Sequence, residues 1–357
     1  MLKTRIIADK AFEMMNLLIK LGLLVMTWIL GLVASLDTLL HNQIAPSREI
    51  YRQVSVPYRE VIQKFETEQS SQVEFRQAVN LTAREQLLLE LINRARHNPT
   101  AEAKRYGIDL NADLEENAIS KSPKQPLAPN QLLTNASRAH SEDMLANDYF
   151  AHESPEGTHP GDRASAAGYE WNHVGENISW GGSTGEIKED EQVPERHERL
   201  FLSAGHRKNL LKDEFREVGI GFLFGRYKHE DKVTYNASMV TELFGANLRT
   251  GYFITGVVYN DASDGSIEDD DFYSIGEGVN GGEVVAVNVE TEEEFPGEIN
   301  AVGGYGIQVP EGAYRIRVNG GGPGAETYES DQVTVQSANV KVDFETTTAR
   351  LISSKSE

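Results

Sequence analysis

The sequence predicts two successive folded domains, an α+β domain followed by an all-β domain. Apolar residues recur at helical spacing over much of residues 81–211, and period-two alternation begins at residue 218. Beyond about residue 250, short β-rich runs separated by turn residues predominate. The 357 residues are enough for two domains and further terminal segments. We therefore place the α+β domain at residues 81–249, the all-β domain at 250–347 and a disordered tail at 348–357.

Composition excludes several classes of function. The formal net charge is −21 at pH 7, which argues against nucleic acid as a partner because phosphate binding needs clustered Lys and Arg. The chain has no cysteine, so disulfide scaffolds, thiolate catalysis and cysteine-based zinc sites are excluded. An acidic surface keeps a protein soluble and can attract divalent cations.

The N-terminus predicts an exported protein. Three basic residues precede an apolar run from Leu17 to Leu36, which contains only Lys20 as a charge. A run of about 20 apolar residues after basic ones is typical of a secretory signal peptide or an uncleaved membrane anchor. Both interpretations stay open for residues 1–40, and an uncleaved helix would make the membrane a partner. Residues 41–80 are polar with a weak helical pattern, which favours a stalk.

The α+β domain is predicted to open with a helix. Thr82 and Glu85 have the spacing of a capping box, apolar residues follow at helical spacing, and Asn98-Pro99 ends the helix. Later elements are predicted at residues 132–147 (helix), 196–211 (helix, with a break at 203–205), 218–224 (strand) and 232–244 (strand), with polar residues 226–232 between the two strands. The two strands form an antiparallel hairpin, and helices before strands indicate a layered α+β architecture.

The all-β domain is predicted from short runs of β-forming residues. Pro310-Glu311-Gly312 is a turn between two of them, and no helical period is present. This pattern is typical of a β-sandwich. The predicted strands are residues 253–259, 283–290, 305–309, 314–318, 332–336 and 339–344.

Chemistry-bearing residues concentrate between residues 140 and 206, which hold six of the nine histidines. His152 follows an aromatic pair in a loop, and His206 lies near a helix start. Glu176 and Asn177 stand between apolar residues, and a carboxylate in that setting needs a partner because burying it unpaired is costly. His140 is expected to be structural. The histidines at 159, 173 and 197 belong to no motif and are interpreted as surface residues.

Several segments of this region resemble a known superfamily when taken in order. They are Ala139–Met144, Phe150-Ala151-His152, Gly175-Glu176-Asn177-Ile178, Gly205-His206-Arg207-Lys208-Asn209 and Glu217-Val218-Gly219-Ile220-Gly221. Together they resemble the bacterial branch of the CAP superfamily, which includes cysteine-rich secretory proteins, antigen five and pathogenesis-related class one proteins. The resemblance covers residues 81–247 and implies an α-β-α sandwich around a central cleft.

The resemblance also implies the site residues. His152, Glu176 and His206 match the two His and one of the two acids that the family places in its cleft. Ser203 stands where many members have the second acid, so chemistry that needs both acids is in doubt. Asn177, Ser203 and His140 are expected to support the cleft.

Three uses of this cleft stay open. Two imidazoles and a carboxylate could hold zinc with an open fourth position, or Mg²⁺ more weakly. The same groups could be a hydrogen-bonded polar cluster that shapes a binding cleft. A metal-dependent hydrolase is the less favoured alternative, because no activated nucleophile is evident and residue 203 is a serine.

The all-β domain has an acidic segment of its own. Between Arg249 and Arg315 there are 14 Asp and Glu but no Lys or Arg. Alternating oxygen ligands followed by glycine are how calcium loops begin, although the spacing is not that of an EF-hand. A calcium-stabilised loop and a solvated acidic loop both stay open. The candidate calcium ligands are Asp261, Asp264, Asp269, Asp271 and Glu277.

Other segments of the all-β domain resemble transthyretin-like and B-type β-sandwich modules of bacterial surface proteins, which act as spacers. They are Gly256-Val257-Val258-Tyr259-Asn260-Asp261, Phe272-Tyr273-Ser274-Ile275-Gly276-Glu277-Gly278 and Pro310-Glu311-Gly312-Ala313-Tyr314.

The function favoured at this point is a bacterial extracytoplasmic CAP-domain protein, secreted or membrane-anchored. Its cleft is expected to bind a small apolar ligand or a cell-surface protein or glycan, without efficient catalysis. The alternatives are a metal-dependent hydrolase using the same cleft and an adhesion or scaffold protein in which the β-sandwich carries the function.

Overall fold

The computed structural model describes residues 78–247, 251–261, 271–319, 327–346 and 351–352. The predicted signal or anchor, the stalk up to residue 77 and nearly all of the predicted tail lie outside the described residues. Among the helices of the described part, none is long and apolar enough to cross a membrane.

The first domain is built around one four-stranded sheet. Its strands, in the order β1-β3-β4-β2, are β1 (Ala128–Pro129), β3 (Glu217–Lys228), β4 (Thr234–Ala246) and β2 (His173–Ser183). β4 pairs antiparallel with both β3 and β2, and β1 pairs parallel with β3. β2 is therefore an edge strand, with one side free to meet loops and helices of the site.

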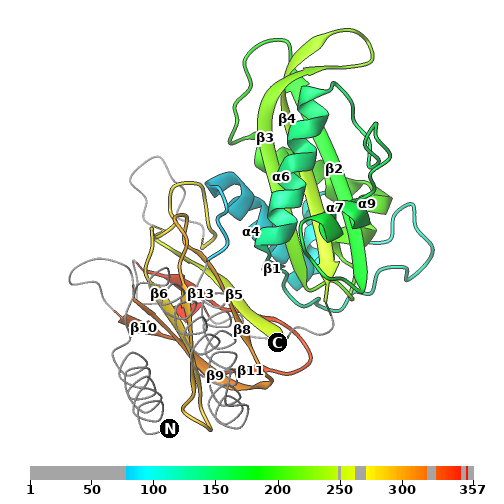
Figure 1. Ribbon diagram of the computed structural model, residues 1–357. Helices are drawn as coiled ribbons and strands as arrows, with labels where there is room; N and C mark the ends of the chain where they lie inside the picture. Colours follow the sequence, from blue (N-terminus) through cyan, green and yellow to red (C-terminus); the bar gives the residue numbers. More distant parts are fainter. Residues whose placement is uncertain (1–77, 248–250, 262–270, 320–326, 347–350, 353–357) are drawn as a thin grey trace, which may run out of the picture. The chain divides into compact units, whose positions relative to one another are not determined.

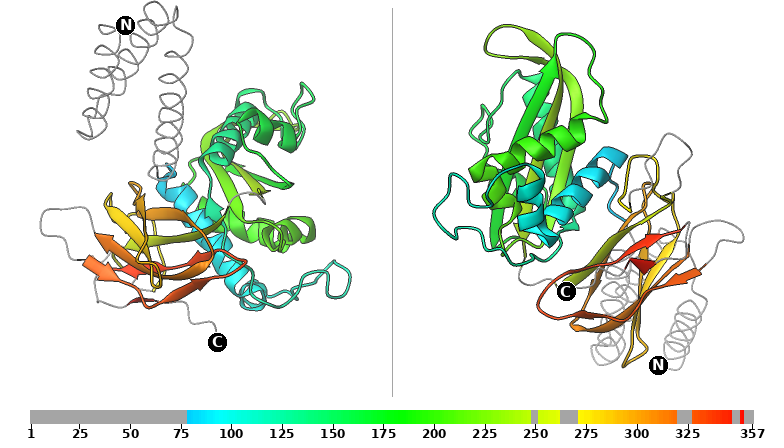
Figure 2. Two further views of the ribbon diagram at one scale, coloured as in Figure 1. Left: turned by 60° about the horizontal axis from the view of Figure 1, so that its bottom comes forward. Right: turned by 180° about the vertical axis from the view of Figure 1, so that it is seen from behind.

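Helices cover both faces of this sheet (Figure 1). On one face lies α6 (Gln131–Ala146), whose Ser137 hydroxyl donates to the carbonyl of Gly219 at 3.0 Å. On the other face lie α4 (Ala83–His97), α8 (Gln192–Leu202) and α9 (Ala204–Leu210), as the view from behind shows for the cyan α4 (Figure 2). The short helices α5 (Pro99–Arg105) and α7 (Pro160–Ala166) complete the domain.

Two apolar cores follow from this layering. Leu88 and Ile92 of α4 and Phe201 of α8 pack in one cluster with Ile220 and Val240 of the sheet. Leu133 and Met144 of α6 belong to smaller clusters on the opposite face, with Leu243 and Met239 of β4. Burial of these side chains on both faces is the main favourable contribution to folding. The arrangement is the predicted α-β-α sandwich.

The start and end of α4 are as predicted. Thr82 accepts a hydrogen bond from the Glu85 amide at 3.3 Å, and the Glu85 carboxylate accepts one from the Thr82 amide at 2.8 Å. Asn98 ends α4 and caps α5, where Pro99 occupies the first turn. The predicted hairpin is also confirmed, but β3 continues to Lys228, so the polar connection is shorter than expected.

The capping box gives a local prediction. We expect Thr82→Ala to lower the free energy of unfolding by about 1 kcal/mol, because it removes the acceptor for an otherwise unpaired amide of the first turn. Urea unfolding followed by circular dichroism measures this. Thr100→Ala, at an exposed position within α5, is the control. Equal effects of the two changes would contradict the assigned cap.

The sequence did not predict β2, α5 or α7. β2 has the sequence His-Val-Gly-Glu-Asn-Ile-Ser-Trp-Gly-Gly-Ser, with three glycines and several polar residues that disfavour strands. It forms because it pairs with β4 along its whole length, from His173 opposite Ala246 to Ser183 opposite Asn236. Tertiary pairing thus overrides local preference.

The second domain is all-β, as predicted, and its described residues form two five-stranded sheets. Ile254, Val284, Ile307, Ile316 and Phe344 belong to its shared apolar core. β7 was not predicted, because it contains Pro296, but proline is tolerated in this strand at the end of its sheet. The strands are β5 (Tyr252–Tyr259), β6 (Glu283–Asn288), β7 (Glu294–Glu298), β8 (Gly304–Val309), β9 (Gly312–Asn319), β10 (Thr327–Glu329), β11 (Val333–Val335), β12 (Val340–Lys341), β13 (Asp343–Glu345) and β14 (Leu351–Ile352).

Candidate functional site

The structure brings the candidate residues together from four separate segments. Glu176 lies on the edge strand β2, and His152 lies in the loop between α6 and α7. Arg163 comes from α7, and His206 from the first turn of α9. We call the site formed by His152, Arg163, Glu176 and His206 the cleft.

Glu176 is the centre of the cleft. Its side chain is only 1% exposed. Oε2 accepts a hydrogen bond from Arg163 Nη2 at 2.6 Å, and Oε1 lies 2.9 Å from His152 Nδ1. Both carboxylate oxygens therefore have a partner, and the guanidinium compensates the buried charge.

His152 is the exposed member of the cleft, with 51% of its side chain accessible to solvent. Because a carboxylate can only accept hydrogen bonds, Nδ1 donates to Glu176. In the neutral ring, Nε2 then carries the lone pair. Glu176 thereby orients an imidazole that can accept a hydrogen bond from a ligand at the surface.

Arg163 was missed by the sequence analysis. Besides Glu176, it donates from Nη2 to the carbonyl of His152 at 2.8 Å and from Nη1 to the carbonyl of Thr158 at 2.9 Å. It therefore fixes the loop of His152 as well as the carboxylate. Its presence could have been expected from Glu176, because a carboxylate between apolar residues needs a cationic partner from elsewhere in the chain. The sequence does not say which cation this is.

His206 joins the cleft through its backbone and its electrostatic surroundings. Its carbonyl accepts from Asn177 Nδ2 at 3.2 Å, and Asn209 donates to the carbonyl of Glu176 at 3.1 Å. These bonds attach α9 to β2 beside the carboxylate. Burial lowers the pKa of the half-buried His206, and the electrostatic influence of the nearby His152 lowers it further. His206 is therefore neutral at pH 7.

The supporting residues have distinct placements. His140 is buried, its Nε2 lies 3.1 Å from the carbonyl of Ala151, and burial lowers its pKa. It thus has the structural role expected of it, next to the loop of His152. Ser203 lies between α8 and α9, where the sequence predicted a helix break. Within the described residues, no hydrogen bond joins its hydroxyl to an imidazole.

The interpretation of His197 as a surface residue was wrong. Its side chain is fully buried on α8, and Nε2 lies 3.0 Å from Oε1 of Glu102. The sequence misleads here because this histidine shares the buried face of α8 with Phe201, and its partner lies in another helix, α5.

Glu242, in the middle of β4, was also missed. It is fully buried opposite Asn177 of β2, and Oε2 accepts from Asn177 Nδ2 at 3.1 Å. Its other oxygen has no hydrogen-bond partner among the described residues. Burial raises the pKa of Glu242 to about 8, so the group is largely protonated at pH 7.

The cleft does not fit a three-ligand zinc or magnesium shell. Both oxygens of Glu176 are engaged by Arg163 and His152, and His152 has turned Nδ1 toward the carboxylate. In the part of the chain that the structure covers, no group of three or more His, Asp and Glu side chains is placed to hold a metal ion. Glu176 is therefore better described as the residue that orients His152 than as a ligand.

The proposed calcium loop is only partly within the described residues. Asp264 and Asp269 lie outside them. Asp261 accepts from the amide of Asp271 at 2.7 Å, and Glu277 accepts from the amide of Ser274 at 2.6 Å. These carboxylates hold the ends of the loop, and calcium binding stays a prediction.

Comparisons with known proteins agree with the fold of the first domain. Residues 89–237 match the family described as CAP, the cysteine-rich secretory protein family. The uncharacterised protein YkwD of Bacillus subtilis is 34% identical over 104 residues, which are 29% of this chain and 37% of that protein. The uncharacterised membrane protein YlbC of the same organism is 34% identical over 82 residues, 23% of this chain and 21% of that protein. The chain thus matches well under half the length of these relatives.

Two solved structures are also similar. An extracellular protein containing an SCP domain from Bacillus anthracis is 23% identical with a TM-score of 0.28, over 46% of this chain and 40% of its own. An outer surface protein from Borrelia burgdorferi is 16% identical with a TM-score of 0.30, over 48% of this chain and 98% of its own.

Proposed function

We propose, from the CAP domain at residues 89–237, that this protein is exported and binds a small, largely apolar ligand with a polar head group in its cleft. The observation that carries the proposal is the geometry of His152, a half-exposed imidazole oriented by the buried Glu176 and Arg163. The acceptor is the Nε2 atom of His152, held in place at the surface by the ion pair of Glu176 and Arg163. Because this ion pair has no net charge, the site suits a hydroxyl or amide head group better than a free ion.

The apolar part of the proposed ligand is inferred from exposed apolar side chains close in sequence to the cleft residues. Three of the six large hydrophobic side chains that are exposed in the described region, Phe150, Trp171 and Leu202, lie within about eight residues in sequence of a cleft residue. Phe150 lies two residues before His152, and Leu202 lies at the end of α8, next to the start of α9. Trp171 donates to Ser165 of α7 at 3.0 Å, on the helix that carries Arg163. Exposed apolar side chains in the segments next to a polar group are compatible with a surface that binds an apolar ligand.

The arrangement favours binding over hydrolysis. Both carboxylate oxygens of Glu176 are already engaged, one by Arg163 and the other by His152, so neither is free to take a proton from a bound substrate. Ser203 takes the place of the second acid and has no imidazole as a hydrogen-bond partner among the described residues.

A cell-surface protein or glycan is the alternative occupant of the cleft. The proposed location outside the cytoplasm is inferred from the N-terminal sequence, in which basic residues precede an apolar run from Leu17 to Leu36.

Binding can be tested with 1-monopalmitoylglycerol, which joins a hydroxylated head to an apolar chain. We expect the full chain to bind it saturably in isothermal titration calorimetry. His152→Ala should weaken binding about tenfold, because it removes one ligand hydrogen bond. The control is His97→Ala, at an exposed position at the end of α4.

Two results would overturn this function. If the His152→Ala and His97→Ala variants bound 1-monopalmitoylglycerol with equal affinity, the cleft would not be its binding site. Stoichiometric zinc in the purified chain, lost together with an esterase activity in His206→Ala, would establish the metal-dependent hydrolase instead.

A further inference from the structure

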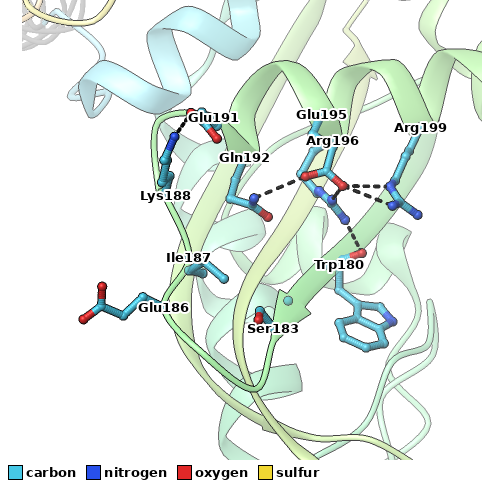
Figure 3. A pocket seen from close by; sticks show the side chains of 12 residues that line it. Trp180, Ser183, Glu186, Ile187, Lys188, Glu191, Gln192, Glu195, Arg196 and Arg199 are labelled. Carbon is cyan, nitrogen blue, oxygen red and sulfur yellow. Dashed lines mark hydrogen bonds and ion pairs between the residues drawn. The ribbon is translucent and has the colours of Figure 1, made fainter.

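A pocket lies at the far end of β2 (Figure 3), and none of its lining residues belongs to the cleft. It is a pocket of about 590 Å³ between the last residues of β2, the loop at residues 184–191 and the first turns of α8. This volume is within the range of small-molecule sites, about 300–1,000 Å³. Gly182 of the pocket follows Glu176 by six residues of strand, so the Cα atoms of these two residues are about 20 Å apart.

The base of the pocket is Arg196 of α8. Its side chain is only 1% exposed, and it donates to the carbonyl of Trp180 and pairs with Glu195 at 2.5 Å. The guanidinium lies directly against Gly181 of β2, so a side chain at position 181 would clash with Arg196 Nη1. Its Nε is buried without a hydrogen-bond partner among the described residues. A buried donor left unpaired in this way is costly, and a ligand or water in the pocket could satisfy it.

Contacts at both ends hold the loop that closes the pocket. Asn236 donates to the carbonyl of Gly185 at 2.8 Å. Arg84 of α4 pairs with Glu189 and Asp190, each at 2.9 Å. The loop is therefore attached to the sheet and to α4 on either side of the pocket, which preorganises the site.

The charges in the pocket balance, and five of the six charged side chains are paired with one another. Lys188 lies 2.6 Å from Glu191. Glu195 accepts from Arg199 at 3.1 Å and from Gln192 at 3.2 Å, in addition to its contact with Arg196 (Figure 3). The three acids and three bases of the lining, which sum to zero, are Glu186, Glu191, Glu195, Lys188, Arg196 and Arg199.

We infer that this pocket binds an uncharged polyhydroxylated ligand, a short oligosaccharide. Each sugar hydroxyl both donates and accepts, so one hydroxyl can bridge a guanidinium and a carboxylate that are already paired. An ionic ligand would have to break such a pair, and an anion would also meet the field of a chain with net charge −21. The polar lining disfavours an apolar ligand.

The test uses the full chain and the trimer of N-acetylglucosamine, an uncharged oligosaccharide. We expect saturable binding by calorimetry, weakened about tenfold by Arg199→Ala, which removes an exposed charged donor from the pocket wall. Lys208→Ala, at an exposed position on α9 outside the pocket, should bind as the wild type does. The glucosamine trimer, which has the same backbone with positive charges, should bind more weakly.

The inference fails if the uncharged trimer does not saturate the protein, if Arg199→Ala binds as tightly as Lys208→Ala, or if the charged trimer binds at least as well. It fails also if His152→Ala abolishes binding while Arg199→Ala leaves it intact, since the sugar would then occupy the cleft. The monopalmitoylglycerol titration is separate, so failure here leaves the proposed function of the cleft standing.

Discussion

Arg163→Met is expected to lower the free energy of unfolding by about 3–5 kcal/mol, the usual cost of leaving a buried charge without its partner. The change leaves the Glu176 carboxylate, whose side chain is 1% exposed, without its cationic partner. It also removes the hydrogen bonds that Arg163 donates to the carbonyls of His152 and Thr158. Urea unfolding of the full chain, followed by circular dichroism, measures the effect.

Arg105→Met provides the matched control. Arg105 is also paired with a buried carboxylate, Glu102, but at 3.6 Å and with 57% of its side chain exposed, so we expect a cost under about 1 kcal/mol. Adding Glu176→Gln to Arg163→Met should recover part of the stability, because it removes the stranded charge. Similar costs for the two arginine changes would contradict the role assigned to Arg163.

Glu242→Gln is expected to stabilise the protein above pH 5 and to flatten its pH dependence. Burial raises the pKa of Glu242 to about 8 in the folded chain, against about 4.3 for an exposed glutamate. Between these two values, the folded state keeps a proton that the unfolded state releases. Stability should therefore fall as pH rises through this window, by at most about 1.4 kcal/mol per pH unit.

The comparison requires unfolding free energies of both proteins at several pH values from 4.5 to 8.5. Glutamine reproduces the neutral form of Glu242, so the variant should lose less stability than the wild type as pH rises. Glu230→Gln, at an exposed position between β3 and β4, should change nothing. The expectation is contradicted if the free energy of unfolding of the wild type does not fall relative to that of Glu242→Gln as pH rises. Glu242 would then be ionised in the folded state.

Local interactions made part of the fold predictable. The capping box of Thr82 and Glu85 and the stop at Asn98-Pro99 involve residues close in sequence, so they could be read directly. The hairpin of β3 and β4 was found from its period-two alternation. β2 could not be found in this way, because its strand conformation depends on β4, which follows it by some fifty residues.

The same distinction applies to the site. His152, Glu176 and His206 lie in short motifs that resemble those of a known superfamily, and the structure brings their segments together. Arg163 and Glu242 lie in no such motif, and their importance comes from the burial of Glu176 and of β4. His197 was misjudged for the same reason, since its partner Glu102 is remote in sequence.

The most direct measurement of ligand binding in the cleft is photo-crosslinking of the full chain with a monoacylglycerol that carries a diazirine in its acyl chain, followed by peptide mapping. The cleft proposal predicts adducts on residues 149–152, on Trp171 or on residues 202–206, with competition by unlabelled 1-monopalmitoylglycerol. Adducts confined to the all-β domain, at residues 252–345, would contradict it and favour a binding or scaffold role for that domain.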